Sequence, residues 1–202
     1  MLLKTLTWIA CLSVAVRLAW GMVANDLGPD PSAAIAFATG KATIWLLAIT
    51  LAITPLRRLS PRLNWLIKFR RLFGLFAFFY ATMHMLTYAA LYTSPSFSLA
   101  AMESDITKRR FITMGVAAYL LLVPLALTST TWAIRKLGGK NWNRLHKLVY
   151  AAAICGVIHY WWQVKTGVIT PLTITLVLSV LFLARPVTSW LQRRKARAAV
   201  AA

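Results

Sequence analysis

Three histidines are the residues of this sequence with the widest chemistry, and all three lie in or at the edge of long apolar segments. His84 is inside the segment GLFAFFYATMHMLTYAALY, whereas His146 begins and His159 nearly ends the segment HKLVYAAAICGVIHY. An imidazole buried among apolar groups is costly unless it binds a ligand or a hydrogen-bond partner. Imidazole nitrogen is also a common axial ligand of haem iron. The histidines therefore predict a cofactor site.

The composition is typical of a membrane protein. The chain has 202 residues, of which 59% are hydrophobic, whereas soluble domains are only ~45–50% apolar. A membrane-spanning helix needs about 20 apolar residues, so this length allows about six spans with short loops. The two cysteines, Cys11 and Cys155, lie in apolar segments without a C-x-x-C motif. This argues against a disulfide framework, a zinc site and covalently attached haem.

Hydropathy divides residues 1–202 into six apolar segments with no linker, internal repeat or soluble appendage between them. The segments are approximately 5–24, 37–56, 72–92, 111–132, 145–163 and 170–190. We therefore predict an all-α membrane protein with six transmembrane helices in a single domain. The first segment lacks a convincing cleavage site, so we expect it to be retained as a span.

The basic residues predict the orientation of these helices. Most of them lie near the termini and in the loops after the second and fourth segments: Lys4, Arg57, Arg58, Arg62, Lys68, Arg70, Arg71, Arg135, Lys136, Lys140, Arg144, Lys147, Arg193, Arg194, Lys195 and Arg197. Because cytoplasmic loops carry an excess of Lys and Arg, both termini are expected in the cytoplasm. Membrane topology thus explains the net charge of +19, and without a nucleic-acid-binding module we expect no nucleic-acid partner. The basic cluster 108–110 is an exception on the outer side, where it could contact a partner, a lipid or a cofactor carboxylate.

His84 and His159 are predicted at the same depth. The third and fifth segments both run outward, and His84 lies roughly 20 Å along its helix from Arg71, as His159 does from His146. Both histidines therefore reach the outer half of the bilayer. A haem b between helices three and five could take one axial ligand from each, and two axial imidazoles suit electron transfer because they leave no open position on the iron.

His146 is expected near the inner face, at the level of Arg70 and Arg71. Arginine has no lone pair for iron, so a second bis-histidine haem cannot form there from these two helices. His146 could instead bind a haem with a different sixth ligand, help to bind a flavin, or face a quinone, with Arg144 nearby. On one ideal helix, His146 and His159 would point about 140° apart. Either the helix deviates locally or the two histidines have different neighbours.

The propionates of a haem b would need cations. Lys41, at the outer start of the second segment, and Arg17, in the outer half of the first, are candidates, and both could equally extend to the outer headgroups. Gly40 and Gly74 could permit close approach of a helix or a cofactor, or could simply pack.

Two other function classes compete with a haem protein. A histidine in a membrane helix often only hydrogen-bonds a neighbouring helix, as it could in a structural anchor for a partner. A proton or ion transporter could use the histidines as a relay, but such relays usually include Asp or Glu, and none of the six segments contains either. The matched depth of two histidines favours the ligand interpretation.

Four stretches also resemble a known family. LTSTTWAIRKLGGKNWNRLHKLVYAAAICGVIHYWWQVK (127–165), RRLFGLFAFFYATMHMLTY (70–88), FATGKA (37–42) and DITKRRFITMG (105–115) together resemble the ferric-reductase-like transmembrane family, and within it the MsrQ (YedZ-type) haem-binding membrane subunits. The resemblance covers nearly the whole chain. By position, His84 and His159 correspond to the outer haem histidines of the family and His146 to its inner histidine, whereas Arg70 stands where larger relatives carry a second histidine.

The resemblance implies a function. MsrQ-like proteins are six-helix proteins of the bacterial inner membrane that carry b-type haem, with FMN also possible. They pass electrons from the quinone pool to a periplasmic molybdopterin enzyme, MsrP, which reduces methionine sulfoxide in oxidised proteins. The final catalysis is therefore expected on an MsrP-like partner; a ferric-reductase-like cytochrome b with another partner is the alternative. No G-x-G-x-x-G motif indicates a nicotinamide domain, which favours a membrane-soluble electron donor.

Overall fold

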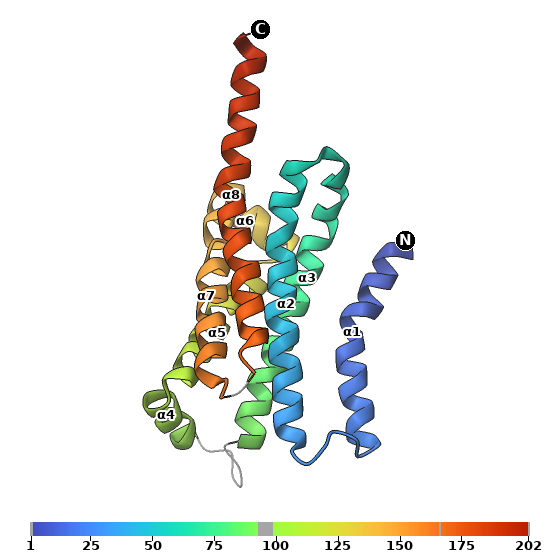
Figure 1. The fold of residues 1–202 in the computed structure, drawn as a ribbon, viewed down its shortest axis with the longest axis vertical. Helices are drawn as coiled ribbons and strands as arrows, with labels where there is room; N and C mark the ends of the chain where they lie inside the picture. The colour runs from blue at the N-terminus through green and yellow to red at the C-terminus, as the bar shows by residue number, and fades with distance from the viewer. Residues whose placement is uncertain (1, 93–98, 166, 202) are drawn as a thin grey trace.

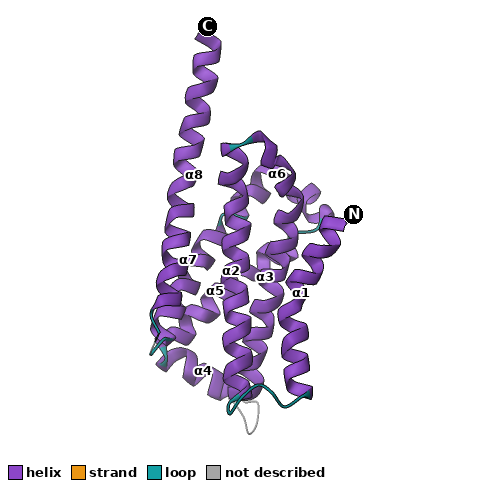
Figure 2. Ribbon diagram, turned by 45° about the vertical axis from the view of Figure 1, so that its right-hand side comes forward, coloured by secondary structure: helices purple, strands orange, loops and turns teal. Residues whose placement is uncertain are grey.

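The protein folds as a bundle of long helices (Figure 1), and the computed structural model describes residues 2–92, 99–165 and 167–201. The elements in chain order are α1 (Leu2–Val23), α2 (Pro31–Leu59), a 3₁₀ helix η1 (Pro61–Leu66), α3 (Ile67–Thr87), a π-helical turn η2 (Tyr88–Tyr92), α4 (Leu99–Lys108), α5 (Arg110–Leu127), α6 (Thr131–Leu145), α7 (Leu148–Gln163) and α8 (Ile169–Ala201). Every element within these ranges is helical (Figure 2), as the predicted all-α class requires.

The long helices run along the bundle, whereas α4 and α6 differ from them in direction (Figure 1). In Figure 1, α1, α2, α3, α5, α7 and α8 follow the long axis, and α4 and α6 lie near opposite ends. One end, which we call the terminal end, holds both chain termini, the α2–α3 connection and α6. The other, the α4 end, holds the α1–α2 connection and α4. The basic loops that were predicted to be cytoplasmic therefore share the terminal end.

In the described part of the chain, five helical segments are long and apolar enough to cross a membrane: Leu2–Val23, Pro31–Leu59, Pro61–Ala90, Arg110–Leu127 and Ile169–Arg194. They match five of the predicted spans. The other predicted span, 145–163, corresponds to α7, which has 16 residues, fewer than the ~20 that a membrane crossing needs. The sixth span therefore stays a prediction.

Local capping explains why two helices begin or end at other residues than the predicted spans. α2 begins at Pro31 instead of residue 37, because the Asp30 side chain accepts a hydrogen bond from the Ala33 backbone N–H (2.9 Å) and Pro31 has no N–H to leave unpaired. The fourth span ends at Leu127 instead of residue 132, because Thr130 caps a new helix by accepting from the Ala133 N–H at 3.1 Å. α6 and α4 lie mostly between the predicted spans, where the hydropathy predicts loops.

Small side chains allow the central helices to pack closely. α2 packs against α3, and α5 against α7, more extensively than any other pairs of described helices. Ala77 of α3 and Ala153 of α7 are fully buried, as is Ile174 of α8. Alanine at a helix interface lets two backbones approach closely. In lipid there is no hydrophobic driving force between helices, so such close packing holds them together.

α1 lies at the edge of the bundle, and a buried tyrosine of α3 bonds to its backbone. The fully buried Tyr80 of α3 donates its hydroxyl hydrogen to the Cys11 carbonyl (2.5 Å) and accepts from the Ala15 N–H (3.2 Å). Cys11 and Ala15 are one helical turn apart, so the Cys11 carbonyl and the Ala15 N–H are the acceptor and donor of one i to i−4 pair in α1. The Tyr80 hydroxyl bonds to both of them. This contact fixes α1 against α3 with few buried apolar residues of its own.

A proline in α2 creates the acceptor that holds α8. Pro55 has no N–H, so the Leu51 carbonyl one turn earlier lacks its helical partner. Arg185 of α8 donates from Nη2 to that carbonyl at 3.0 Å, and from Nη1 to the Tyr150 hydroxyl of α7. The guanidinium also lies 4.8 Å from the centre of the Tyr150 ring. One arginine thus connects three helices.

We predict that Arg185→Met lowers the free energy of unfolding by about 1–3 kcal/mol, because it leaves the buried Leu51 carbonyl without a donor. Arg193→Met, an exposed position of the same helix, is the control and should change stability little. Thermal unfolding in detergent measures both. Adding Pro55→Ala to Arg185→Met should recover part of the loss, since the restored backbone N–H can bond to Leu51; a double variant that is less stable than the single one would contradict this account.

Candidate cofactor site

A cavity of about 530 Å³ lies among α2, α3, α5 and α7. Its volume is within the ~300–1,000 Å³ range of small-molecule and cofactor sites. α4 and η2 also contribute to its lining, so the cavity is in the part of the bundle nearest the α4 end. Most of its wall is apolar: Ala36, Phe37, Ile44, Leu47, Ala81, Phe111, Ile112, Val116, Leu122 and Ala152.

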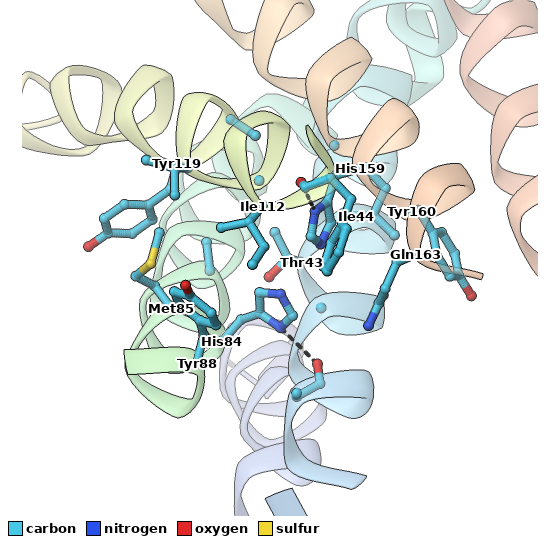
Figure 3. Close-up of a pocket in the computed structure, with 18 of the residues that line it drawn as sticks. Thr43, Ile44, His84, Met85, Tyr88, Ile112, Tyr119, His159, Tyr160 and Gln163 are labelled. Carbon is cyan, nitrogen blue, oxygen red and sulfur yellow. Dashed lines mark hydrogen bonds between the residues drawn. The ribbon is translucent and has the colours of Figure 1, made fainter. Parts of the chain in front are cut away.

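His84 of α3 and His159 of α7 meet inside this cavity, as their matched depth predicted (Figure 3). Their ring centres are 5.9 Å apart and their planes are inclined by 84°. Metal–imidazole bonds are about 2 Å long, so two imidazoles on opposite sides of one metal ion have ring centres about 6 Å apart. The two imidazoles are therefore spaced so that they could hold one metal centre between them, such as the iron of a haem.

Both rings are oriented in the same way by the backbone. Nδ1 of His84 lies 2.8 Å from the Ala36 carbonyl oxygen, and Nδ1 of His159 lies 2.6 Å from the Phe111 carbonyl oxygen. A carbonyl only accepts, so each Nδ1 carries the hydrogen and each Nε2 keeps a lone pair. Metal-binding histidines usually donate their other N–H in this way, which fixes the ring and its tautomer.

A glycine one turn after each acceptor makes room for the ring. A Cβ on Gly40, four residues after Ala36, would lie 3.1 Å from Nδ1 of His84. A Cβ on Gly115, four residues after Phe111, would lie 2.8 Å from Nδ1 of His159. The same arrangement of carbonyl, glycine and histidine thus occurs twice, once between α2 and α3 and once between α5 and α7. In each, the histidine follows the residue that provides the carbonyl by 48 positions.

This repeat was missed in the sequence. Two glycines were predicted to permit close approach. Gly40 lies against a histidine, whereas a Cβ on Gly74 would meet only Thr50, at an ordinary 3.8 Å. Gly115 was not singled out at all. The equal spacing of 48 residues between each carbonyl and its histidine was the available signal, but the two glycine-containing stretches share too few residues to stand out.

The cations around the cavity differ from those predicted. Lys41 lines it, as proposed for a propionate partner, but Arg17 lies on the exposed face of α1 and does not. Arg109, from the outer basic cluster 108–110, and Lys165 line it as well. Arg109 Nε is 3.1 Å from an Asp105 carboxylate oxygen. Arg17 is too far out in the bundle for the role proposed, because α1 packs only at the bundle edge.

Asp105 joins the cavity wall to α4. Its carboxylate accepts a hydrogen bond from the Tyr88 hydroxyl at 3.1 Å while it pairs with Arg109. Asp105, Tyr88 and Arg109 all line the cavity. The helix α4 is therefore held against the end of α3 and the start of α5 by polar contacts at the cavity, a connection that sequence reasoning did not predict.

His146 lies at the other end of the bundle, away from this cavity. It is not part of α7, as the predicted segment 145–163 had it, but ends α6, and α7 begins at Leu148. This break removes the conflict of 140° between His146 and His159, because the two no longer share a helix. Nδ1 of His146 is 3.1 Å from the Trp142 carbonyl, and its ring stacks on the Trp142 indole with centres 3.8 Å apart.

The residues predicted around His146 form a looser group than the pair His84 and His159. Nε2 of His146 is buried and has no hydrogen-bond partner, and Arg70 is close enough to interact electrostatically with the ring, as is the Leu125 carbonyl. Arg70 is half-buried, whereas Arg71 and Arg144 are exposed. Arg70 is therefore the inner-site arginine that interacts with His146, whereas Arg71 and Arg144 are at the surface.

Comparisons with known proteins identify the family of this chain. Residues 38–157 match the model of the family described as "Ferric reductase like transmembrane component". A protein of Herminiimonas arsenicoxydans named "Protein-methionine-sulfoxide reductase heme-binding subunit MsrQ" is 44% identical over 96% of this chain and 88% of its own length. The chain belongs to the MsrQ group of the ferric reductase-like transmembrane family.

Other MsrQ proteins are similarly close. One of Rhodospirillum rubrum is 42% identical over 95% of this chain and 90% of its own length, and one of Azospira oryzae is 43% identical over 89% and 76%. Membership of this transmembrane family and the long apolar helices together make the chain a membrane protein. The matched range 38–157 contains His84 and His146 and ends just before His159.

We predict that Gly115→Ala destabilises the protein by about 1–3 kcal/mol, because the new methyl group overlaps the His159 ring and the ring must leave its bond to Phe111. Gly139→Ala is the matched control, since a Cβ there meets nothing within 4 Å. Thermal unfolding of the two variants measures the difference. In a His159→Ala background the Gly115→Ala penalty should shrink, and an unchanged penalty would show that the ring is not its cause.

Proposed function

We propose that this chain is the haem-binding membrane subunit of a methionine sulfoxide reductase system, with one haem b held in the cavity by Nε2 of His84 and Nε2 of His159. The single observation that carries the proposal is the pair of rings 5.9 Å apart, each with its Nδ1–H donated to a backbone carbonyl. The names of the MsrQ relatives, which describe heme-binding subunits, support the same ligand.

The donor set also favours haem over a bare metal ion. In the described part of the chain, no group of three or more His, Cys, Asp or Glu side chains could hold a metal. Two imidazoles are too few for a structural or catalytic zinc site. They suffice for a haem, because the macrocycle provides the other iron ligands, and a haem ligated on both faces supplies one-electron transfer when bound.

The residues of the cavity have separate tasks in this proposal. The Ala36 and Phe111 carbonyls orient the two ligands, and the apolar wall excludes water from them. Lys41, Arg109 and Lys165 provide positive charge where the haem carboxylates would need it. Arg109 would share its charge with Asp105, which it already contacts. Arg17 has no part in this set.

Electron entry is assigned to the terminal end. We place both termini in the cytoplasm and count α7 as a sixth span of a single domain, because the positive loops share the terminal end. In a bacterial inner membrane, electrons would enter from the quinone pool near His146 and Arg70 and leave at the α4 end to a periplasmic, MsrP-like molybdopterin enzyme. The stacked Trp142–His146 pair and the buried, unpartnered Nε2 make this the best candidate for a quinone, flavin (FMN) or second-haem contact.

We predict that His84→Ala and His159→Ala each abolish the Soret band and the reduced α band of the purified protein, since each removes one axial ligand. Absorbance spectra of the oxidised and dithionite-reduced protein provide the measurement. His146→Ala is the control and should keep the bis-histidine spectrum. A bis-histidine spectrum that survives in either of the first two variants would refute the ligand assignment, and clean wild-type protein without a Soret band would refute haem binding.

We also predict that His146→Ala slows reduction of the haem by a quinol analogue while the spectrum stays unchanged, because the variant alters only the entry side. Stopped-flow absorbance at the α band gives the rate, and Arg144→Ala, at an exposed position of the same helix, serves as the comparison. A wild-type rate in His146→Ala would exclude His146 from the path of the electrons.

A further inference from the structure

Buried polar side-chain atoms without a partner gather at the terminal end of the bundle. Within the described residues they are Thr54 Oγ1, Arg57 Nε, Arg185 Nε and His146 Nε2. The first three carry a hydrogen to donate, and a buried donor without an acceptor is unfavourable. Thr54 and Arg57 are one turn apart on α2, and Arg185 is bonded to Leu51, the residue one turn before Thr54. The three unsatisfied donors are therefore close to one another in the fold.

Like charges are crowded at the same place. Arg70 is near enough to Arg57 and to Arg185 for electrostatic repulsion, and Arg185 is near Arg58. These arginines come from three helices, α2, α3 and α8. Repulsion among guanidinium groups in a half-buried, low-dielectric setting is costly unless an anion lies among them.

No side chain of the protein provides that anion. The sequence has four acidic residues, and all of them lie at the α4 end, with Asp26 and Asp30 in the α1–α2 connection and Glu103 and Asp105 in α4. The hydrogen-bond partners of Arg185 and Arg58 are neutral. Arg185 bonds to the Leu51 carbonyl and the Tyr150 hydroxyl, and Arg58 donates to the Ser189 hydroxyl at 2.7 Å and the Arg185 carbonyl at 3.2 Å.

The surroundings of the cluster are apolar and exposed. Leu56 and Leu59 of α2 and Val187 and Trp190 of α8 are between 40% and 63% exposed and flank the arginines in sequence. In a membrane these side chains face lipid, and tryptophan favours the level of the headgroups. An anion that reaches the cluster from this side would carry acyl chains along the same apolar faces.

We propose that the arginines at the terminal end of α2, α3 and α8 form a binding site for the phosphate group of an anionic phospholipid. Guanidinium groups match phosphate with paired, charge-assisted hydrogen bonds, and basic pockets between helices on the cytoplasmic side are suited to acidic headgroups. The site is distinct from the histidine cavity, which lies toward the other end of the bundle. A phosphate bound there would accept hydrogen bonds from the unpaired donors of Arg57, Arg185 and Thr54. Its negative charge would also offset the repulsion from Arg70.

The test uses the full chain purified in detergent. Native mass spectrometry records bound phospholipid, and thermal unfolding is followed during titration with phosphatidylglycerol, with phosphatidylcholine and with inorganic phosphate. We expect retained phosphatidylglycerol and a saturable rise in melting temperature that phosphatidylcholine and inorganic phosphate do not reproduce. In Arg57→Gln, the phosphatidylglycerol concentration that gives half of the rise in melting temperature should increase roughly tenfold or more, because a charge-assisted bond is lost. Arg62→Gln, at an exposed position of η1, should stay within about twofold of the unaltered chain.

Thr54→Val keeps the shape of the side chain, removes only its donor, and should weaken the stabilisation severalfold if Arg57→Gln fails to fold. The Soret band should stay unchanged in all of these variants, which separates this site from the haem site. Three results would overturn the proposal: equal stabilisation by inorganic phosphate alone, equal lipid response of Arg57→Gln, Thr54→Val and Arg62→Gln, or loss of haem in Arg57→Gln. The last would assign the arginines to the carboxylates of a haem.

Discussion

The cavity depends on a hydrogen bond from an imidazole N–H to a carbonyl that already belongs to a helix. A peptide oxygen has two lone pairs, so Ala36 and Phe111 can accept from a histidine without leaving their own helices. The ring can reach the carbonyl only where the residue one turn later has no side chain, which is why Gly40 and Gly115 stand there. This interaction sets the direction of each Nε2. The separation of the two rings, and with it the fit to a haem, follows from the packing of α2 on α3 and of α5 on α7.

At the terminal end, a side chain again donates a hydrogen bond to a backbone carbonyl of another helix. Pro55 removes a backbone donor inside α2, and the Leu51 carbonyl becomes an acceptor for Arg185 of α8. The bundle therefore gains a polar connection between helices in a region where apolar packing against lipid gives little net stability. The cost is a buried cation, and several such cations lie together without a carboxylate. The terminal end thus combines clustered positive charge with unpaired donors, which is the setting that the proposed anion site needs.

The two ends of the bundle differ in chemistry. The α4 end has the histidine pair, the acidic residues and the contact between Asp105, Tyr88 and Arg109. The terminal end has the single His146, its stacked Trp142 and the arginines. A donor from the membrane and an acceptor outside it would therefore meet different surfaces.

The sequence by itself determined the helical class, five of the spans, the depth of His84 and His159, and the family. These follow from hydropathy, from the rise per residue of a helix and from local motifs, all of which are properties of short stretches of chain. It could not determine the helix α4, the break between His146 and α7, or the absence of Arg17 from the cavity. Caps, turns and the outer position of α1 decide these, and they depend on contacts between residues far apart in sequence. The roles of Gly40 and Gly115 were likewise decided by tertiary structure alone, because a glycine matters there only through the ring that another helix brings against it.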